Sequence, residues 1–354
     1  MKYIFLLVLL ILIIIILRIC SIETFENTRT VYIVSNIQNG GAVKYLTDIT
    51  KHYTNNTYIY IKSKNDLNNI IFNKNDILFI QHILDTDISI DDLINIDKTN
   101  YKTYLSIHDF EWLIGNNNFH NVTNSYLFSK DDIVNSPNYK NIELLFNKMD
   151  LIIHPSQFTY DTYSKYYSNN NFIKVSHNDY YINHDSKYIP KIINNTINIG
   201  HLSTFDECKG SEYILDLMDK YKTYNGYTIN FIISNYNSPT YNELEYYDYI
   251  KKYNIHALTY LNKWGETWCY SLTKGLNTGL PIIYNNIGAF KERLYEKNKE
   301  QYFKAFDTEY DDIKKIHDSF EKMLDYIIEN NGKYNNFYNN SEILYEPFYN
   351  NLFS

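Results

Sequence analysis

Glu266 is the residue whose type and position best suit chemistry on a bound ligand. It follows a Trp/Gly turn and precedes a segment of helix length. After that segment come Gly279-Leu280-Pro281, an apolar strand and a small-residue loop at Gly288-Ala289. In open α/β sheets, ligands bind in the crevice outside the carboxyl ends of the strands. A carboxylate at the mouth of such a strand–helix–strand unit is therefore expected to face a ligand.

Two earlier segments have the composition of anion-binding turns. Lys209-Gly210 precedes a predicted helix, and a lysine charge beside oriented helix N–H groups suits a diphosphate. Asn39-Gly40-Gly41-Ala42 lies between a predicted strand and a predicted helix, and its glycines allow the backbone to approach a ligand. The alternatives are a solvated surface lysine and an ordinary glycine turn.

His108 ends a predicted strand within Ser106-Ile107-His108-Asp109-Phe110. This position brings an imidazole to the carboxyl end of a strand, where it can reach a cleft. A structural histidine with its hydrogen bonds satisfied inside the protein is the alternative interpretation.

The elements that must position these residues alternate between short apolar strands and helical stretches. Strands are predicted over 31–35, 58–61, 77–81, 104–108, 151–154 and 172–176, and again over 197–202, 227–234, 256–260 and 281–284. Helices are predicted over 42–53, 211–221 and 311–329. This alternation indicates mostly parallel sheets with helices on both faces. The polar stretch 181–195, which contains Pro190, is interpreted as a linker.

The length of 354 residues suits two domains of about 150 residues each, which we expect over 30–185 and 195–335, with a C-terminal segment over 336–354. The net charge is -8, and no block rich in Lys or Arg is present, which argues against a nucleic-acid partner. The 3 cysteines include no CxxC pair, which excludes a disulfide framework and a cysteine zinc site.

The N-terminus has the composition of a membrane segment. An unbroken apolar run extends from Tyr3 to Leu17, and Ile19, Cys20 and Ile22 can lengthen it. The run alone spans roughly 22 Å as a helix, against ~30 Å for the hydrocarbon core. We expect residues 1–23 to form a single anchor, with a cleaved signal peptide as the alternative. The flanking charges are nearly symmetric, so they do not predict the orientation.

The segment from Glu266 to Glu292 resembles the donor-sugar motif of retaining glycosyltransferases of family 4. That motif is a Glu, seven residues, a second Glu, then small residues ending in Gly-x-Pro and a strand. The first Glu is matched by Glu266, but Lys274 occupies the second position. Gly40-Gly41-Ala42, His108-Asp109 and Lys209-Gly210 resemble further family elements, although Thr204–Glu207 lacks the basic residue that often precedes Lys-Gly.

The resemblance implies a GT-B fold, in which two Rossmann-like domains face a cleft. The first domain would lie on the acceptor side and the second would bind a nucleotide-diphosphate sugar. Glu266 and His108 would be catalytic, and no metal or other cofactor would be needed. The acceptor would be a glycan, lipid or protein. The residues implied in donor binding are Gly40, Gly41, Lys209, Gly210, Tyr270, Ser271, Lys274 and Gly288.

Two alternatives to this reading stay open. Lys274 has only hydrogen-bond donors and cannot reproduce the acceptor bonds that the family's second Glu makes to a ribose. The chain could therefore be a sugar- or nucleotide-binding protein without transfer activity. Asp85-Thr86-Asp87 also has the Asp-x-Asp form of metal-dependent glycosyltransferases, but Asp91-Asp92 follows it, which is typical of a solvated acidic loop.

Overall fold

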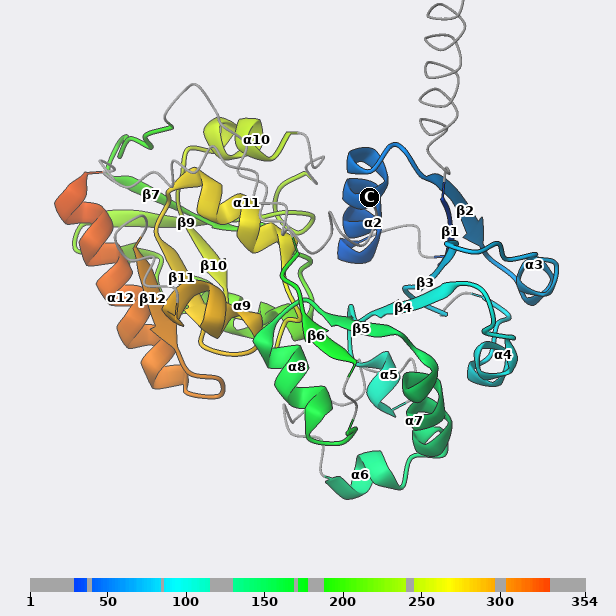
Figure 1. The fold of residues 1–354 in the computed structure, drawn as a ribbon. Helices are drawn as coiled ribbons and strands as arrows, with labels where there is room; N and C mark the ends of the chain where they lie inside the picture. The colour runs from blue at the N-terminus through cyan, green and yellow to red at the C-terminus, as the bar shows by residue number, and fades with distance from the viewer. Residues whose placement is uncertain are drawn as a thin grey trace, which may run out of the picture.

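The computed structural model places two six-stranded sheets in two lobes (Figure 1). It describes residues 29–36, 40–83, 86–114, 130–168, 171–177, 188–239, 245–296 and 304–331. The predicted membrane segment 1–23 and the C-terminal segment 336–354 lie outside the described residues, as do Asn39 and Asp85. Within these ranges, no helix is long and apolar enough to cross a bilayer.

The first sheet is entirely parallel and has the strand order β2-β1-β3-β4-β5-β6. Its strands are β1 (Thr30–Val34), β2 (Thr57–Ile61), β3 (Ile77–Ile80), β4 (Lys102–Ser106), β5 (Leu151–His154) and β6 (Phe172–Lys174). The helices of this lobe are α2 (Gly41–His52), α3 (Lys64–Asn68), α4 (Ile90–Asn95), α5 (Glu111–Ile114), α6 (Lys130–Val134), α7 (Tyr139–Lys148) and α8 (Gln157–Ser164).

The second sheet has the order β12-β11-β10-β7-β9-β8 and is parallel except for the pair β8–β9. Its strands are β7 (Thr196–His201), β8 (Thr223–Tyr224), β9 (Tyr227–Ile233), β10 (Ile255–Tyr260), β11 (Ile282–Asn285) and β12 (Ala305–Thr308). The helices are η2 (Glu207–Lys209), α9 (Ser211–Lys220), α10 (Tyr246–Lys252), α11 (Tyr270–Thr278), the π-helical turn η4 (Lys291–Glu296) and α12 (Ile313–Asn330).

The central strands are apolar on both faces because helices cover both faces of each sheet there, whereas the edge strand β2 is mostly exposed. Every residue of β3 and of β10 is buried, as expected for central strands of a parallel sheet covered by helices. Serine side chains begin several of the helices: Ser63, Ser89 and Ser156 each accept a hydrogen bond from the first turn of α3, α4 and α8. The predicted fold class of two Rossmann-like α/β units is confirmed.

The order of strands creates one switch point in each sheet. In the first sheet the chain runs from β1 to one side and returns on the other as β3, and in the second sheet β7 and β10 have the same relation. Loops at the carboxyl ends of two such strands diverge and leave a crevice. The segments at these crevices are Gly40–Ala42 and Gln81–His82 in one lobe, and Leu202–Lys209 and Asn262–Glu266 in the other.

Candidate functional site

A cavity of about 760 Å³ lies where the switch-point loops of the two sheets meet. Loops after β1, β3, β4 and β6 line one side, and loops after β7, β9 and β10 line the other. The lining therefore consists of carboxyl-end loops from both sheets. Its ionisable residues are Lys44, His82, His108, Asp109, His177, Asp206, Lys209, Cys269, Tyr270, Lys274 and Glu266.

Glu266 is held in the cavity by three donors that all bond to one oxygen. Lys209 Nζ forms an ion pair with Oε1, Asn262 Nδ2 lies 2.6 Å from it and Trp264 Nε1 lies 3.2 Å from it. The other oxygen, Oε2, accepts no hydrogen bond from the described residues. The carboxylate is thus fixed through one oxygen, and the second has capacity for a ligand hydroxyl.

Lys209 is the cationic partner of this carboxylate. Burial alone would lower the pKa of Lys209, but the adjacent Glu266 carboxylate raises it above its ordinary value. The ammonium group therefore stays charged at neutral pH. Its Nζ also lies 5.4 Å from the centre of the Trp264 ring, within the range of a cation–π contact.

The loop that carries Glu266 is held by hydrogen bonds from β11 and from the loop that follows β11. Asn285 on β11 donates to the carbonyl of Asn262 at 2.8 Å, and Ala289 N–H donates to the carbonyl of Glu266 at 2.8 Å. A Cβ atom at Gly288 would come within 2.6 Å of the Glu266 backbone nitrogen, so only glycine allows this approach. Gly288 therefore supports the carboxylate from outside the cavity.

Helix α11 begins at the cavity wall with an unusual turn. Cys269 precedes its first residue with a φ of 74°, and no side chain among the described residues caps that turn. The buried Arg293 side chain donates from Nη1 to the carbonyls of Trp268 and Cys269 at 2.6 and 2.7 Å. It thereby stabilises the turn, which leaves the first N–H groups of α11 beside Tyr270 and Ser271 available to an anion.

Helix α2 of the other lobe begins at the same cavity. Gly40 precedes it with φ 90° and ψ -170°, a conformation that L-residues rarely adopt. A Cβ atom at Gly41 would lie 3.1 Å from the Tyr270 ring, so the two helix starts are in close contact. The glycine pair lets α2 approach α11 across the cavity.

His108 is tied to the second lobe through its backbone. Thr267 Oγ1 donates to the His108 carbonyl at 2.6 Å, which links the loop after β4 to the loop after β10. Loss of hydration lowers the pKa of His108 well below its ordinary value, and the neighbouring His177 lowers it further. The imidazole is therefore neutral at physiological pH, and its buried Nε2 atom has no hydrogen-bond partner among the described residues.

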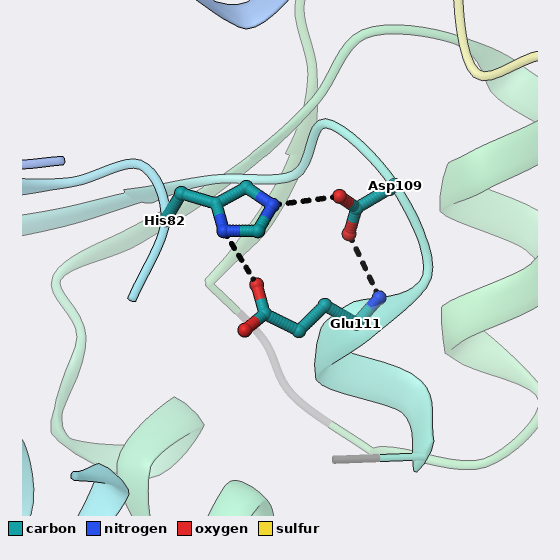
Figure 2. Close-up of side chains that lie close together, drawn as sticks. All are labelled: His82, Asp109 and Glu111. Atoms are coloured by element: carbon teal, nitrogen blue, oxygen red, sulfur yellow. Dashed lines mark hydrogen bonds and ion pairs between the residues drawn. The ribbon is translucent and has the colours of Figure 1, made fainter. Parts of the chain in front are cut away.

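His82, Asp109 and Glu111 form a charged cluster, and His82 and Asp109 of this cluster line the cavity (Figure 2). Nε2 of His82 lies 2.8 Å from Asp109 Oδ2, and Nδ1 lies 2.9 Å from Glu111 Oε2. Burial would lower the pKa of His82, but the two carboxylates raise it to about 10. Since both ring nitrogens face carboxylates, the arrangement is that of a doubly protonated imidazolium, and it fixes the loop that carries His108.

The same three residues are the group in the described part of the chain whose atoms could converge on a metal ion. A metal would need a ring nitrogen without a proton, whereas both nitrogens here lie at hydrogen-bond distance from separate carboxylates. The donor set therefore fits an ion pair better than a metal site.

Eight of the ten residues predicted for the site line the cavity: Gly40, Gly41, His108, Lys209, Glu266, Tyr270, Ser271 and Lys274. Gly210 and Gly288 do not. A Cβ atom at Gly210 would lie 2.0 Å from the Leu261 carbonyl oxygen, so this glycine allows close packing between two loops. Lys274 lies one turn into α11, and its Nζ is 5.8 Å from the centre of the Tyr246 ring.

Two further polar residues, His201 and Asp87, lie outside the cavity lining. His201 does not line the cavity, because its Nδ1 lies 3.0 Å from Thr259 Oγ1 and its Nε2 lies 3.0 Å from Ser203 Oγ. Burial lowers the pKa of His201 to about 4, so it supplies no positive charge. Asp87 accepts a hydrogen bond from the Lys64 backbone at 2.6 Å and lies outside the cavity lining.

Sequence reasoning missed His82 and His177, both of which line the cavity. A usable signal existed, because each residue directly follows a strand that the apolar pattern predicts. The same rule that selected His108, a histidine at the carboxyl end of a parallel strand, applies to both.

Comparison with solved structures supports the two-lobe fold. HepE of Anabaena in complex with UDP is similar with a TM-score of 0.54 and 11% identity, covering 86% of this chain and 91% of that one. HepE with UDP-glucose gives 0.51 and 13%, with 86% and 91% covered. A glycosyltransferase from Rickettsia africae gives 0.53 and 13%, with 86% and 89% covered.

No sequence-family profile and no curated protein sequence matches the chain. The structural likeness establishes the fold alone, which is the GT-B arrangement of two Rossmann-like domains around a cleft.

Proposed function

We propose that this protein is a glycosyltransferase that moves a sugar from a nucleotide diphosphate to a glycan, lipid or protein acceptor. The observation that carries the proposal is the cavity at both switch points, where Glu266 is held by Lys209 beside the uncapped start of α11. The fold adds support, since HepE, which is similar in fold, was solved with UDP and UDP-glucose. The resemblance of the segment 266–292 to family 4 favours a retaining enzyme.

The residues of the cavity suit the roles that such a reaction needs. Lys209 and the first N–H groups of α11 would stabilise the charge of the leaving diphosphate, so we propose that no metal is required. Oε2 of Glu266 would accept a hydrogen bond from the sugar, and the carboxylate would stabilise positive charge that develops at the anomeric carbon. His108 would position the sugar and the acceptor.

In the proposed reaction, the bond between the anomeric carbon and the β-phosphate oxygen breaks. The acceptor oxygen forms its bond to the same face of that carbon, and its proton passes to the leaving phosphate oxygen. Because the leaving group takes the proton, no separate general base is needed. Alignment of acceptor and donor supplies the remainder of the rate enhancement.

The test is binding and turnover with a panel of nucleotides and nucleotide sugars, with and without a chelator. We expect selective binding of one nucleoside diphosphate and its sugar, release of that nucleoside diphosphate when acceptors are supplied, and no effect of the chelator. If no member of the panel binds, the proposal is wrong. If the chelator abolishes activity, metal independence is wrong.

Lys274 favours a second candidate, a sugar- or nucleotide-binding protein without transfer activity. Lys274 lines the cavity where the family motif has a second carboxylate. The variant Lys274→Glu distinguishes the two candidates. We expect it to weaken donor binding in an active enzyme that uses Lys274. The second candidate predicts binding without product and no change in Lys274→Glu, so a gain of turnover in this variant would count against it.

We also propose that residues 1–23 anchor the chain in a membrane, because they include the apolar run from Tyr3 to Leu17. A cleaved signal peptide is the competing proposal. Mass spectrometry of the mature protein from the membrane fraction decides between them, since an anchor requires that these residues are retained.

A further inference from the structure

His177 occupies the cavity wall in an unusual setting. It follows β6, is 4% exposed and lines the cavity. Its ring stacks on Tyr45 with centres 4.2 Å apart, and the Tyr270 ring lies nearly parallel on it at 5.7 Å. The Tyr270 hydroxyl lies 3.1 Å from Nδ1. The ring is thus fixed in position by one residue from each lobe.

The second ring nitrogen of His177 is not matched. Nε2 is buried and has no hydrogen-bond partner among the described residues. Either tautomer leaves it unsatisfied: if Tyr270 donates to Nδ1, then Nε2 carries a proton without an acceptor, and otherwise it is an acceptor without a donor. An unsatisfied buried polar atom is destabilising, and beside a cavity a bound ligand can satisfy it.

Its position at the cavity distinguishes His177 from other buried histidines. Both ring nitrogens of His154 are also unpartnered, but this ring lies among Tyr160, Tyr163 and Phe172 and does not line the cavity. Missing partners alone therefore do not indicate a site. His177 combines a missing partner with a place in the same cavity as Glu266 and His108.

His108 gives His177 a neighbour of the same chemistry. The two ring centres are 5.3 Å apart, and Nε2 of His108 is likewise buried without a partner among the described residues. Burial lowers the pKa of His177 to about 3, so this imidazole is neutral as well. Two neutral nitrogens beside the Tyr45 ring offer hydrogen bonds and an aromatic surface without a charge. This chemistry suits sugar hydroxyls, whereas phosphates are better served by Lys209.

We propose that His177 is a sugar-contacting residue whose Nε2 forms a hydrogen bond with a hydroxyl of the transferred sugar or of a sugar acceptor. The proposal rests on the proposed function and adds a residue and a ligand class to it. It also gives Tyr270 a defined part, because its hydroxyl group, 3.1 Å from Nδ1, fixes the orientation of the imidazole.

The test compares His177→Phe and His177→Gln with the matched control His154→Phe in the full chain. Phenylalanine keeps the stack on Tyr45 and removes both nitrogens, whereas the glutamine amide can replace Nε2. Calorimetric titrations use UDP, UDP-glucose, UDP-N-acetylglucosamine, GDP and GDP-mannose, and then glucose in the presence of UDP.

We expect His177→Phe to weaken binding of the preferred nucleotide sugar about 5- to 10-fold, the scale of one hydrogen bond, and to leave the nucleoside diphosphate unaffected. His177→Gln should recover part of this loss, and His154→Phe should lose stability but keep both affinities. Loss confined to glucose in the presence of UDP would assign the hydroxyl to the acceptor.

The proposal is overturned if His177→Phe and His177→Gln both bind sugar ligands like the parent, or if they lose UDP and UDP-sugar affinity equally. The parent protein separates this failure from that of the proposed function. If the parent binds no member of the panel, both are wrong. If the parent binds a nucleotide sugar and the variants do not differ from it, only the role of His177 is wrong.

Discussion

At the scale of single residues, the ion pair between Glu266 and Lys209 reduces the charge that each side chain can offer to a ligand. Lys209 is engaged with Oε1 of Glu266, yet it is also the cation best placed for a diphosphate. A bound phosphate would compete for the ammonium group and leave Glu266 held by Asn262 and Trp264. Binding of a phosphate to Lys209 would therefore increase the effective negative charge of the Glu266 carboxylate that contacts the sugar.

This coupling predicts opposite effects of Glu266→Ala on turnover and on nucleotide binding. Turnover should fall at least ~100-fold, the scale of losing one preorganised polar contact. The affinity for UDP should stay equal or rise, because Lys209 no longer has a competing carboxylate. Steady-state assays of UDP release and calorimetric titration measure the two quantities. Asp219→Asn, which changes an exposed carboxylate on α9, should affect neither. Turnover within a few fold of the parent would contradict the role of Glu266.

His82 predicts a stability effect that depends on pH in a particular direction. Its pKa is raised to about 10 in the folded protein, against an ordinary value of 6.5. The folded state therefore holds the proton more tightly than the unfolded state. The stabilisation is fully present below pH 6.5 and is lost as the pH rises toward 10.

We therefore expect His82→Gln to lower the free energy of unfolding by about 3 kcal/mol at pH 6, because it leaves the buried Glu111 and the partly buried Asp109 without their cation. The difference between variant and parent should shrink as the pH approaches 10. Urea unfolding at pH 6, 8 and 10 measures it. A difference that grows with pH, or that does not change, would show that the imidazole is not held as an imidazolium.

At the scale of elements, the start of α2 requires a glycine because of its backbone conformation. A side chain at this position would have enough space. Gly40 has φ 90°, and a Cβ atom there would meet nothing within 4 Å. Gly226, in the turn between β8 and β9, has φ 82° and equally open surroundings, but it lies outside the cavity lining. The two positions therefore form a matched pair.

We expect Gly40→Ala and Gly226→Ala each to reduce the free energy of unfolding by about 1–2 kcal/mol, from the strain of a positive φ. Gly40→Ala should also lower nucleotide affinity or turnover, because relief of that strain shifts the first turn of α2 at the cavity. Gly226→Ala should leave both unchanged. Equal functional effects in the two variants would mean that α2 does not contribute to the site.

The order of most strands could be predicted because long apolar runs and strand-end motifs are local properties of the sequence, whereas helices α3 to α8 and α10 were not predicted. β5 (Leu151–His154) was predicted with its observed bounds, and α9 and α12 to within one or two residues. The edge strands β8 and β12 were missed. β8 has only two residues, and β12 (Ala305–Thr308) has an exposed Asp307 and gains its strand conformation by pairing with β11.

Site residues could be predicted where a local motif identifies them. They could not be predicted where their role depends on a contact between two distant elements. Glu266 and Lys209 each lie at a recognisable strand–helix junction. The turn at Cys269 instead depends on Arg293, which is distant in sequence, and the ring stack on His177 needs one tyrosine from each lobe. Such contacts follow from the packing of elements, which no local pattern encodes.

At the scale of the whole molecule, the two lobes have separate cores. One buried cluster extends from Ile197 to Ile327, and the other two lie between Val31 and Val175. The hydrogen bonds that join the lobes include those of Thr267 with the His108 carbonyl, Tyr270 with His177 and the Gln157 backbone with Glu292. Lobes with their own cores that are joined by hydrogen bonds and ring contacts are expected to unfold as distinct units.

Separate cores make a prediction for ligand-induced stabilisation. Lys209, Ser271 and the start of α11 all belong to the second lobe, so a nucleoside diphosphate should stabilise that lobe more than the first. At 100 times the dissociation constant, the gain is about 2.7 kcal/mol for the unit that binds. Differential scanning calorimetry with and without UDP should resolve two transitions, of which one moves upward strongly and the other little. Hydrogen exchange identifies the lobe that the ligand stabilises. UDP should increase the protection of amides in β7 and β10 more than in β1 and β3. A single transition that shifts as a whole would mean that the contacts across the cavity couple the lobes into one cooperative unit.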